Sequence, residues 1–207
     1  MEYTRVYKEI DKAIKMGKHY IVNIGGAGSS KTYSTMQYLL NKLVNNQEEL
    51  LNILVIRKTN AGVKASPYPI AIDLLSQMGV DIKCESDNIV CGKNRIYFSG
   101  LKTLESKYYT KAYNMIYIEE ATEMSVLDFN RIISHPCNLL FISCNPVFND
   151  KNYWIKDICK NVMAEVVHST HKDNPFMSKE FHIYIEELAK IDRVLNSIYN
   201  LGIEQTK

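Results

Sequence analysis

A short apolar segment, residues 19–24, runs directly into a turn rich in glycine and serine that ends in Lys31 and Thr32. The residues of this turn are Gly25, Gly26, Ala27, Gly28, Ser29 and Ser30. Backbone N–H groups in such a loop converge on phosphate oxygens, because glycine lets the chain approach an anion closely. The helix that follows directs the positive end of its dipole at the same anion. We therefore expect a phosphate site, with Lys31 reaching the terminal phosphates and the Thr32 hydroxyl holding Mg²⁺.

This glycine-rich loop (residues 25–32) departs at one position from the usual phosphate-binding pattern, G-x-x-x-x-G-K-[ST]. Gly25 is the first glycine of the pattern, but Ser30 occupies the position of the glycine before the lysine. The alternative at this point is a glycine-rich turn that binds no phosphate.

Two adjacent acids, Glu119 and Glu120, follow the apolar residues 115–118. A buried strand here would deliver both carboxylates to the same edge of the sheet as the glycine-rich loop. We expect Glu119 to bind Mg²⁺ through water, and Glu120 to orient or deprotonate an attacking water molecule. Successive strand residues point to opposite faces, so the two acids need not share one role. The alternative is a solvated strand end.

A further apolar run, residues 139–144, ends in Asn145 and Pro146. Proline lacks a backbone donor and stops the strand, so Asn145 should lie at the strand end. There its amide would sense the terminal phosphate, although Asn-Pro is also a common turn.

Alternating apolar runs and amphipathic stretches predict an α/β fold with a doubly wound, mainly parallel sheet. Strands are expected at residues 19–24, 51–58, 115–119, 139–144 and 163–169, and helices at 4–16, 31–46, 69–78, 124–134, 153–160 and from 178 onward. Three short segments between residues 82 and 98 predict a small antiparallel ribbon.

Composition limits the function classes. A chain of 207 residues suits one domain with one core. The net charge of +2 excludes a global basic field for nucleic acid. Five cysteines without a CxxC pair suit a reducing compartment rather than a disulfide scaffold. No apolar run approaches a membrane span. The isolated pair His168 and His171 is not expected to bind a metal.

The order of these motifs resembles the large terminase subunit of tailed double-stranded DNA bacteriophages. The segments that carry the resemblance are residues 56–59, 97–100, 119–121, 143–146 and 172–176, read as Ile-Arg-Lys-Thr, Tyr-Phe-Ser-Gly, Glu-Glu-Ala, Ser-Cys-Asn-Pro and Lys-Asp-Asn-Pro-Phe. It covers roughly residues 5–202. The resemblance implies a P-loop ATPase of the ASCE, RecA-like class that uses ATP and Mg²⁺ to drive viral DNA into a preformed capsid.

The same resemblance implies the partners and the compartment. Double-stranded DNA would be bound weakly and without sequence preference, and the portal protein and the small terminase subunit would be further partners. A homo-oligomeric ring is expected on assembly, with a monomer as the alternative for the isolated domain. The place of action would be the cytoplasm of the infected bacterial host, and the protein would not belong to the mature virion.

The chain departs from the family in two respects. Family loops often carry an arginine, where this loop has Ala27. Arg57, at the end of a predicted strand, is therefore expected to act on phosphate in its own or a neighbouring subunit, and the alternative is a structural arginine paired with a carboxylate. The family also has a C-terminal nuclease domain, which residues 1–207 are expected to lack, leaving a single ATPase domain.

Other interpretations stay open at this stage. A small-molecule kinase is one alternative, although Glu120 argues against it, and a nucleotide-binding module without turnover is another. Basic and aromatic residues mix in a loop-like stretch that could contact DNA or a neighbouring subunit, or simply be solvated: Lys102, Lys107, Tyr108, Tyr109 and Lys111. The adenine could be contacted by Tyr3, Tyr7 or Tyr20, which precede the glycine-rich loop.

Overall fold

The computed structural model describes residues 2–46, 49–80, 82–85, 87–107, 111–147 and 153–204. Eight strands form one sheet in the order β3-β4-β5-β2-β6-β7-β1-β8. Their bounds are β1 (Tyr20–Gly25), β2 (Asn52–Arg57), β3 (Lys83–Cys84), β4 (Asn88–Cys91), β5 (Asn94–Gly100), β6 (Met115–Ile118), β7 (Leu139–Cys144) and β8 (Ala164–Ser169). The strands from β5 to β8 in this order pair in parallel, and β3 and β4 add an antiparallel ribbon. The predicted fold class and ribbon are confirmed.

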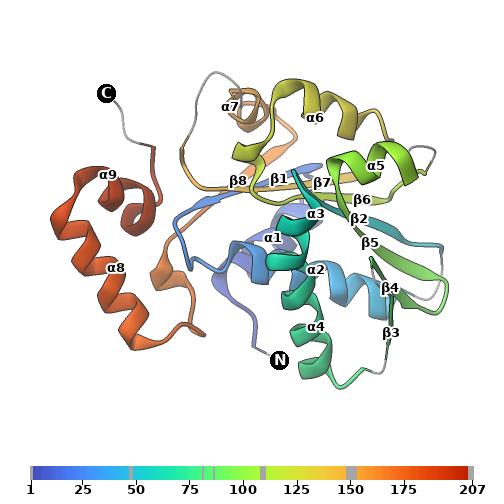
Figure 1. Ribbon diagram of the computed structural model, residues 1–207, viewed down its shortest axis with the longest axis horizontal. Coiled ribbons are helices and arrows are strands. Elements are labelled where there is room, and N and C mark those ends of the chain that lie inside the picture. Colours follow the sequence, from blue (N-terminus) through green and yellow to red (C-terminus); the bar gives the residue numbers. More distant parts are fainter. Residues whose placement is uncertain are drawn as a thin grey trace.

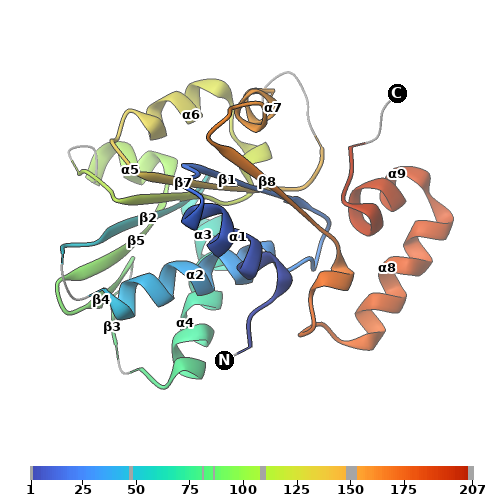
Figure 2. The ribbon, with the colours of Figure 1, turned by 180° about the vertical axis from the view of Figure 1, so that it is seen from behind.

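Helices cover both faces of the sheet, as Figures 1 and 2 show. One face carries α1 (Arg5–Lys15), α2 (Lys31–Asn45), α3 (Asn60–Ala65) and α4 (Pro67–Met78), and the other carries α5 (Leu101–Lys107), α6 (Val126–Ile133) and α7 (Trp154–Cys159). Beside the carboxyl ends of the strands stand α8 (Lys179–Ile191), α9 (Arg193–Leu195) and the π-helical turn η3 (Asn196–Leu201). We call these three elements the C-terminal helical unit.

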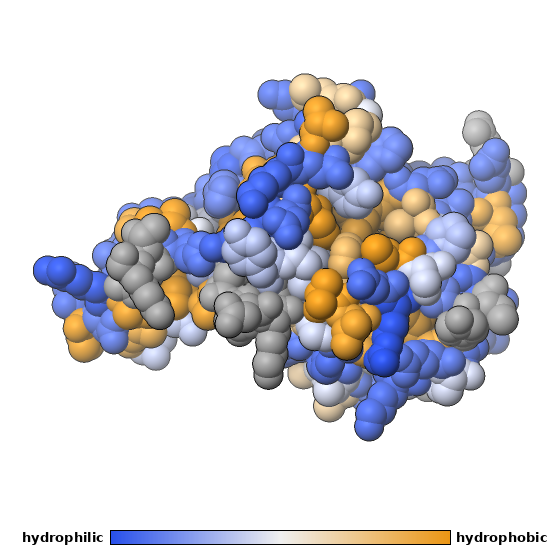
Figure 3. All heavy atoms as spheres, turned by 90° about the horizontal axis from the view of Figure 1, so that it is seen from above, coloured by the Kyte–Doolittle hydropathy of each residue, from blue (hydrophilic) through white to orange (hydrophobic). Residues whose placement is uncertain are grey.

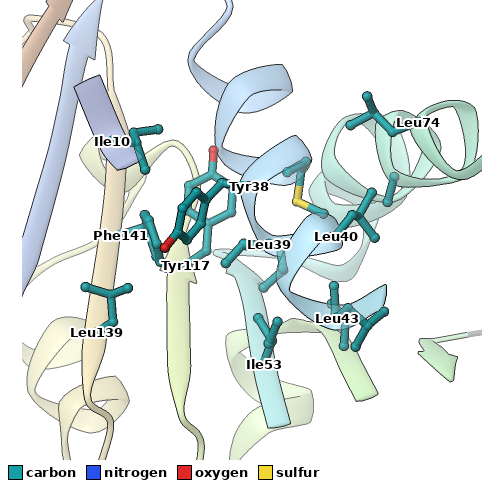
Figure 4. Close-up of a cluster of buried hydrophobic side chains, with 14 of the residues drawn as sticks. Ile10, Tyr38, Leu39, Leu40, Leu43, Ile53, Leu74, Tyr117, Leu139 and Phe141 are labelled. Atoms are coloured by element: carbon teal, nitrogen blue, oxygen red, sulfur yellow. The ribbon is translucent and has the colours of Figure 1, made fainter. Parts of the chain in front are cut away.

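Two apolar cores hold the layers together because alternate strand residues face opposite sides of the sheet. Figure 4 shows the first core, where Tyr38 and Leu39 of α2 pack against Tyr117 and Phe141 of the sheet. In the second core, Trp154 of α7 stacks on Phe129 of α6 with ring centroids 4.1 Å apart. Burying large rings on both faces fixes α2, and with it the glycine-rich loop, against the middle of the sheet.

The strand order brings the predicted motifs together. β1 lies beside β7, and β7 lies beside β6, all in parallel. Parallel neighbours end at the same edge of a sheet, so the glycine-rich loop, the two acids and Asn145 share one edge. β2 pairs with β6 and brings the residue at its end, Arg57, to that edge as well.

Two helices were not predicted as such. α3 lies between the strand expected at 51–58 and the helix expected at 69–78, where no element was expected. Thr59 caps it by accepting a hydrogen bond from the Gly62 amide. α5 replaces the expected loop around Lys102 and Lys107, because Leu101 and Leu104 are buried on one side of it, three residues apart.

Figure 3 views the face of α5, α6 and α7 and shows hydrophobic areas separated by hydrophilic side chains. Three apolar residues of α6, Val126, Leu127 and Ile133, are exposed. None of the helices in the described parts of the chain combines the length and apolarity needed to cross a membrane.

Asn94, at the start of β5, gives a stability prediction. Its buried amide accepts from the Leu51 amide at 3.0 Å and donates to the carbonyls of Leu43 at 3.1 Å and Asn46 at 2.6 Å. These bonds close the end of α2 and the start of β2. Asn94→Ala should lower the free energy of unfolding by about 2–4 kcal/mol, because three backbone groups, two of them buried, lose their partner. Chemical denaturation measures this loss. Asn45→Ala, at an exposed α2 position, is the control and should change stability by less than about 0.5 kcal/mol.

Candidate functional site

The glycine-rich loop is packed closely on the side that faces away from solvent. A side chain at Gly25 would overlap the Ser169 carbonyl at the end of β8, and one at Gly26 would overlap the Tyr199 carbonyl of η3. The Ser29 hydroxyl donates to the Gly26 carbonyl at 2.9 Å and accepts from Ser169 at 3.0 Å. Only glycine fits at these two positions, so the backbone itself forms the contact with β8 and η3.

Lys31, the first residue of α2, is buried, and its ammonium group contacts oxygens alone. It donates to the carbonyls of Gly25 at 2.8 Å and Gly26 at 2.7 Å, to the Ser29 hydroxyl at 3.2 Å and to Asn145 Oδ1 at 3.3 Å. Burial lowers the pKa of Lys31 to about 8, against the opposing effect of Glu120. The contact with Asn145 joins the loop after β1 to the end of β7, and the role of Asn145 as a phosphate sensor stays a prediction.

Two residues other than glycine adopt left-handed backbone angles in the described chain, and both belong to this site. Ser30 has φ 65° and Glu120 has φ 50°. For a residue with a Cβ this conformation costs roughly 1–2 kcal/mol, so the surrounding structure must impose it. Ser30 thus holds the angle for which the usual pattern has a glycine.

Glu119 is buried next to the glycine-rich loop. Its Oε1 accepts from the Ser66 hydroxyl at 2.7 Å, whereas Oε2 has no hydrogen-bond partner among the described residues. Burial raises the pKa of Glu119, and hydrogen bonds from Ser66 and Thr32 lower it in part. Thr32 and Glu119 therefore lie close to each other, and their joint binding of Mg²⁺ stays a prediction.

Arg57 lies between two carboxylates rather than on the open side of the loop. Its NH2 group donates to Glu123 at 2.6 Å, and its Nε lies 3.8 Å from Glu119 Oε2. NH1 also donates to the Gly62 carbonyl at 3.3 Å. This arrangement favours the structural alternative, in which Arg57 pairs with carboxylates, over a direct action on phosphate.

A cavity of about 460 Å³ opens along the glycine-rich loop. The described residues that line it are Ala27, Gly28, Ser29, Ser30, Lys31, Thr32, Tyr33, Ile70, Glu120, Asn145, Asn174, Phe176 and Met177. Lys31, Thr32, Glu120 and Asn145, each expected from the sequence, thus border one space. Glu119 is not among the residues that line this cavity.

The tyrosines considered for adenine are not among the residues that line this cavity. Tyr3 stacks on Tyr7 with ring centroids 4.2 Å apart, and Tyr7 packs against Tyr38. Tyr20 begins β1 and lines a hollow of about 580 Å³ beneath α6 and α7, at the opposite edge of the sheet. The expectation therefore fails for Tyr20 because it mistook nearness in sequence for nearness in space.

The stretch of basic and aromatic residues between 102 and 111 is only partly described by the structure. The stretch around Lys107 is helical, Lys107 pairs with Asp87, and Lys111 lies over the Tyr97 ring. Tyr108 and Tyr109 lie outside the described residues. The described chain holds no cluster of three or more potential metal ligands.

Sequence reasoning missed two supporting residues. Ser66 fixes Glu119 from the start of α4, and Asn174 donates to the Gly28 carbonyl at 2.8 Å. Asn174 lies inside the 172–176 segment that carried the family resemblance, so its position had a signal but no assigned role.

The parallel sheet, the glycine-rich loop with its lysine, and the acids at the end of β6 together define the class: this is a P-loop NTPase fold. The profile of one family, described as phage terminase large subunit, matches residues 17–203. The chain belongs to the phage terminase large subunit family.

Solved structures show the same fold. The large terminase of a thermophilic bacteriophage superposes with a TM-score of 0.80 at 15% identity, over 98% of this chain and 54% of that chain. The HK97 bacteriophage large terminase gives a TM-score of 0.70 at 16% identity, over 99% and 51%. An ATPase-domain mutant from Thermus phage P74-26 gives 0.70 at 9% identity, over 99% and 95%.

The chain thus spans about half the length of the first two of these large terminases. A comparison with curated protein sequences found no match.

The left-handed angle of Ser30 predicts a stabilising substitution. Ser30→Gly should raise the free energy of unfolding by up to about 1 kcal/mol. Removing Cβ relieves backbone strain in the folded state, and this gain should exceed the entropic stabilisation that glycine gives to the unfolded chain. Denaturant titration measures the change. Ser30→Ala keeps Cβ and should bring no gain. A loss above about 1 kcal/mol in Ser30→Gly would show instead that the 3.3 Å bond from the Ser34 hydroxyl matters more than the strain.

The lowered pKa of Lys31 predicts a pH dependence. Between pH 8 and 10.5 the unfolded chain holds a proton on this lysine that the folded chain has released, so wild-type stability rises with pH there. Below pH 8 both states are charged and the full burial cost persists. Lys31→Met lacks this titration, so wild type should gain stability relative to Lys31→Met from pH 8 to 10. Lys12→Met, at an exposed site on α1, is the control. Parallel stability profiles for wild type and Lys31→Met would contradict the burial of the charge.

Proposed function

We propose that this chain binds ATP with Mg²⁺, hydrolyses it, and works as the motor domain of a phage DNA-packaging enzyme. One observation carries the proposal: Lys31, Thr32, Glu120 and Asn145, from three different strand ends, border a single cavity. Family membership supports the packaging role. The large terminase of the thermophilic bacteriophage has been solved in complex with ADP and with ATP-γ-S, and the Phi-28 gp11 relative is described as a DNA packaging motor.

The residues divide the chemistry among them. Lys31 would exchange its hydrogen bonds to the loop carbonyls for hydrogen bonds to the terminal phosphate oxygens. Negative charge develops on these oxygens during phosphoryl transfer. Glu120 would take the proton from the attacking water, whose oxygen forms the new bond to the γ-phosphorus. The bond from this phosphorus to the bridging oxygen breaks, and ADP leaves with that electron pair. Asn145, already in contact with Lys31, would sense the γ-phosphate.

The residues present fit a divalent cation. Glu119 Oε2 is a buried carboxylate oxygen without a hydrogen-bond partner among the described residues, and the Thr32 side chain is close enough to the Glu119 carboxylate to lower its pKa. Oxygen ligands of this kind suit Mg²⁺, which would neutralise phosphate charge when bound with ATP. Arg57 would act mainly through Glu119, by favouring its ionised form.

DNA contact would be weak and independent of sequence. The 25 lysines and arginines are nearly balanced by 23 acidic residues, so the net charge of +2 gives little overall attraction to the DNA phosphates. A motor that moves along DNA should also not read bases. Assembly into a ring, with the portal protein and the small terminase subunit, belongs to the same proposal.

Phosphate release from ATP tests the proposal against its two alternatives. Wild type with Mg²⁺ should release inorganic phosphate without any added acceptor. A kinase would transfer the phosphate to an acceptor instead, and a binding module would hold ATP without release.

Glu120→Gln predicts a separation of binding from turnover. The amide keeps the shape of the side chain but cannot accept the proton, so hydrolysis should fall by about 10²–10⁴-fold. ATP binding, measured by calorimetry, should stay within about twofold of wild type. Glu105→Gln, which removes an exposed carboxylate paired with Arg131, is the matched control and should hydrolyse normally. Normal turnover by Glu120→Gln would reassign the base.

A further inference from the structure

The cavity along the glycine-rich loop has a wall that a triphosphate alone does not explain. Beside Lys31 and Glu120 it is lined by Tyr33, Ile70, Phe176 and Met177. Tyr33 directly follows Thr32 on α2, Ile70 comes from α4, and the other two come from the segment before α8. Phosphates are strongly hydrated anions, whereas apolar and aromatic walls with few polar groups are typical of sites for flat organic groups.

Phe176 is held in place relative to the glycine-rich loop by Asn174. The Asn174 side chain is only 8% exposed. Its Nδ2 donates to the Gly28 carbonyl at 2.8 Å, and its Oδ1 accepts from the Phe176 amide at 3.1 Å. One side chain therefore fastens the loop to the backbone of Phe176. The backbone from which the Phe176 ring projects is therefore held beside the loop.

The Phe176 ring leaves part of its surface open. It is 46% exposed, and its centroid lies 5.0 Å from that of Tyr33 at an angle of 45°. The Tyr33 hydroxyl donates to Gln77 Oε1 at 3.3 Å, which ties its ring to α4. An exposed, braced aromatic ring beside an anion-binding loop can stack on a nucleobase.

We propose that Phe176, with Tyr33, Ile70 and Met177, forms the nucleobase subsite of this chain. The base stacks on Phe176 while the phosphates lie along the glycine-rich loop. This inference rests on the proposed function, since a bound nucleotide is what brings a base to this cavity.

The polar inventory of the subsite indicates how the base is held. Ile70, Phe176 and Met177 carry no hydrogen-bonding side-chain group, and the Tyr33 hydroxyl donates to Gln77, so stacking and apolar contact carry most of the binding. Stacking is tolerant of base identity because every base has a π-face. We therefore expect GTP to bind within about tenfold of ATP.

Two probes separate the base from the phosphates: ATP and inorganic tripolyphosphate, each titrated calorimetrically with Mg²⁺. Wild type should bind ATP more tightly than tripolyphosphate. Phe176→Ala should weaken ATP about tenfold, in the range known for loss of one base–aromatic stack, and leave tripolyphosphate within about twofold. Phe176→Trp should retain ATP affinity. Phe176→Leu keeps an apolar side chain but has no ring, so its ATP affinity should fall nearly as far as that of Phe176→Ala.

Tyr184→Ala is the matched control, because it removes an aromatic ring of α8 that is 57% exposed and does not line the cavity. Unchanged ATP affinity in Phe176→Ala, or an equal loss for both probes, would overturn the subsite while leaving the proposed function intact. A GTP affinity more than about a hundredfold below that of ATP would overturn the stacking mode. A wild type that binds neither probe would overturn the proposed function itself, and the subsite with it.

Discussion

The edge of the sheet is organised around one buried positive charge, the ammonium group of Lys31. Removing such a group from water is costly unless oxygens converge on it. Here they come from the loop after β1 and from Asn145 after β7. The two sources meet only because β1 and β7 are parallel neighbours, and β6 continues the row with its acids. The crossover helices, the two cores and the strand order all serve this convergence.

The sequence predicted the strands and helices better than it predicted the polar contacts that hold the site residues in place. Apolar runs and glycine punctuation predicted β1, β6 and β7, and parallel pairing then placed Lys31, Glu120 and Asn145 at one edge. The bonds from Ser66 to Glu119 and from Asn174 to Gly28 could not be predicted in the same way. They join short polar side chains that are far apart in sequence and follow no periodic pattern. The α5 helix was missed for the opposite reason: its lysines suggested a loop, while only the spacing of two buried leucines carried the helical signal.

Strain is concentrated where the chemistry is proposed. Ser30 and Glu120, on two different loops, both hold angles that glycine adopts more easily. A cost of roughly 1–2 kcal/mol at each residue is small beside the stabilisation from burying the two cores, so the scaffold can impose both angles. The strain of Glu120 turns the chain sharply after β6. That turn separates the directions of two adjacent carboxylates, one buried against Arg57 and one at the cavity.

The glycine-rich loop is packed directly against the end of the C-terminal helical unit. Gly26 abuts the Tyr199 carbonyl, and Gly202 lies against Gly25, so no free space separates the loop from the end of the C-terminal helical unit. The same unit has a second contact with the main body of the protein through His171, which follows β8. The ring nitrogens of His171 contact His182 at 2.7 Å and Asn200 at 3.0 Å. Any shift of the Gly26 backbone toward η3 would therefore have to displace Tyr199, so the position of the glycine-rich loop and that of the C-terminal helical unit depend on each other.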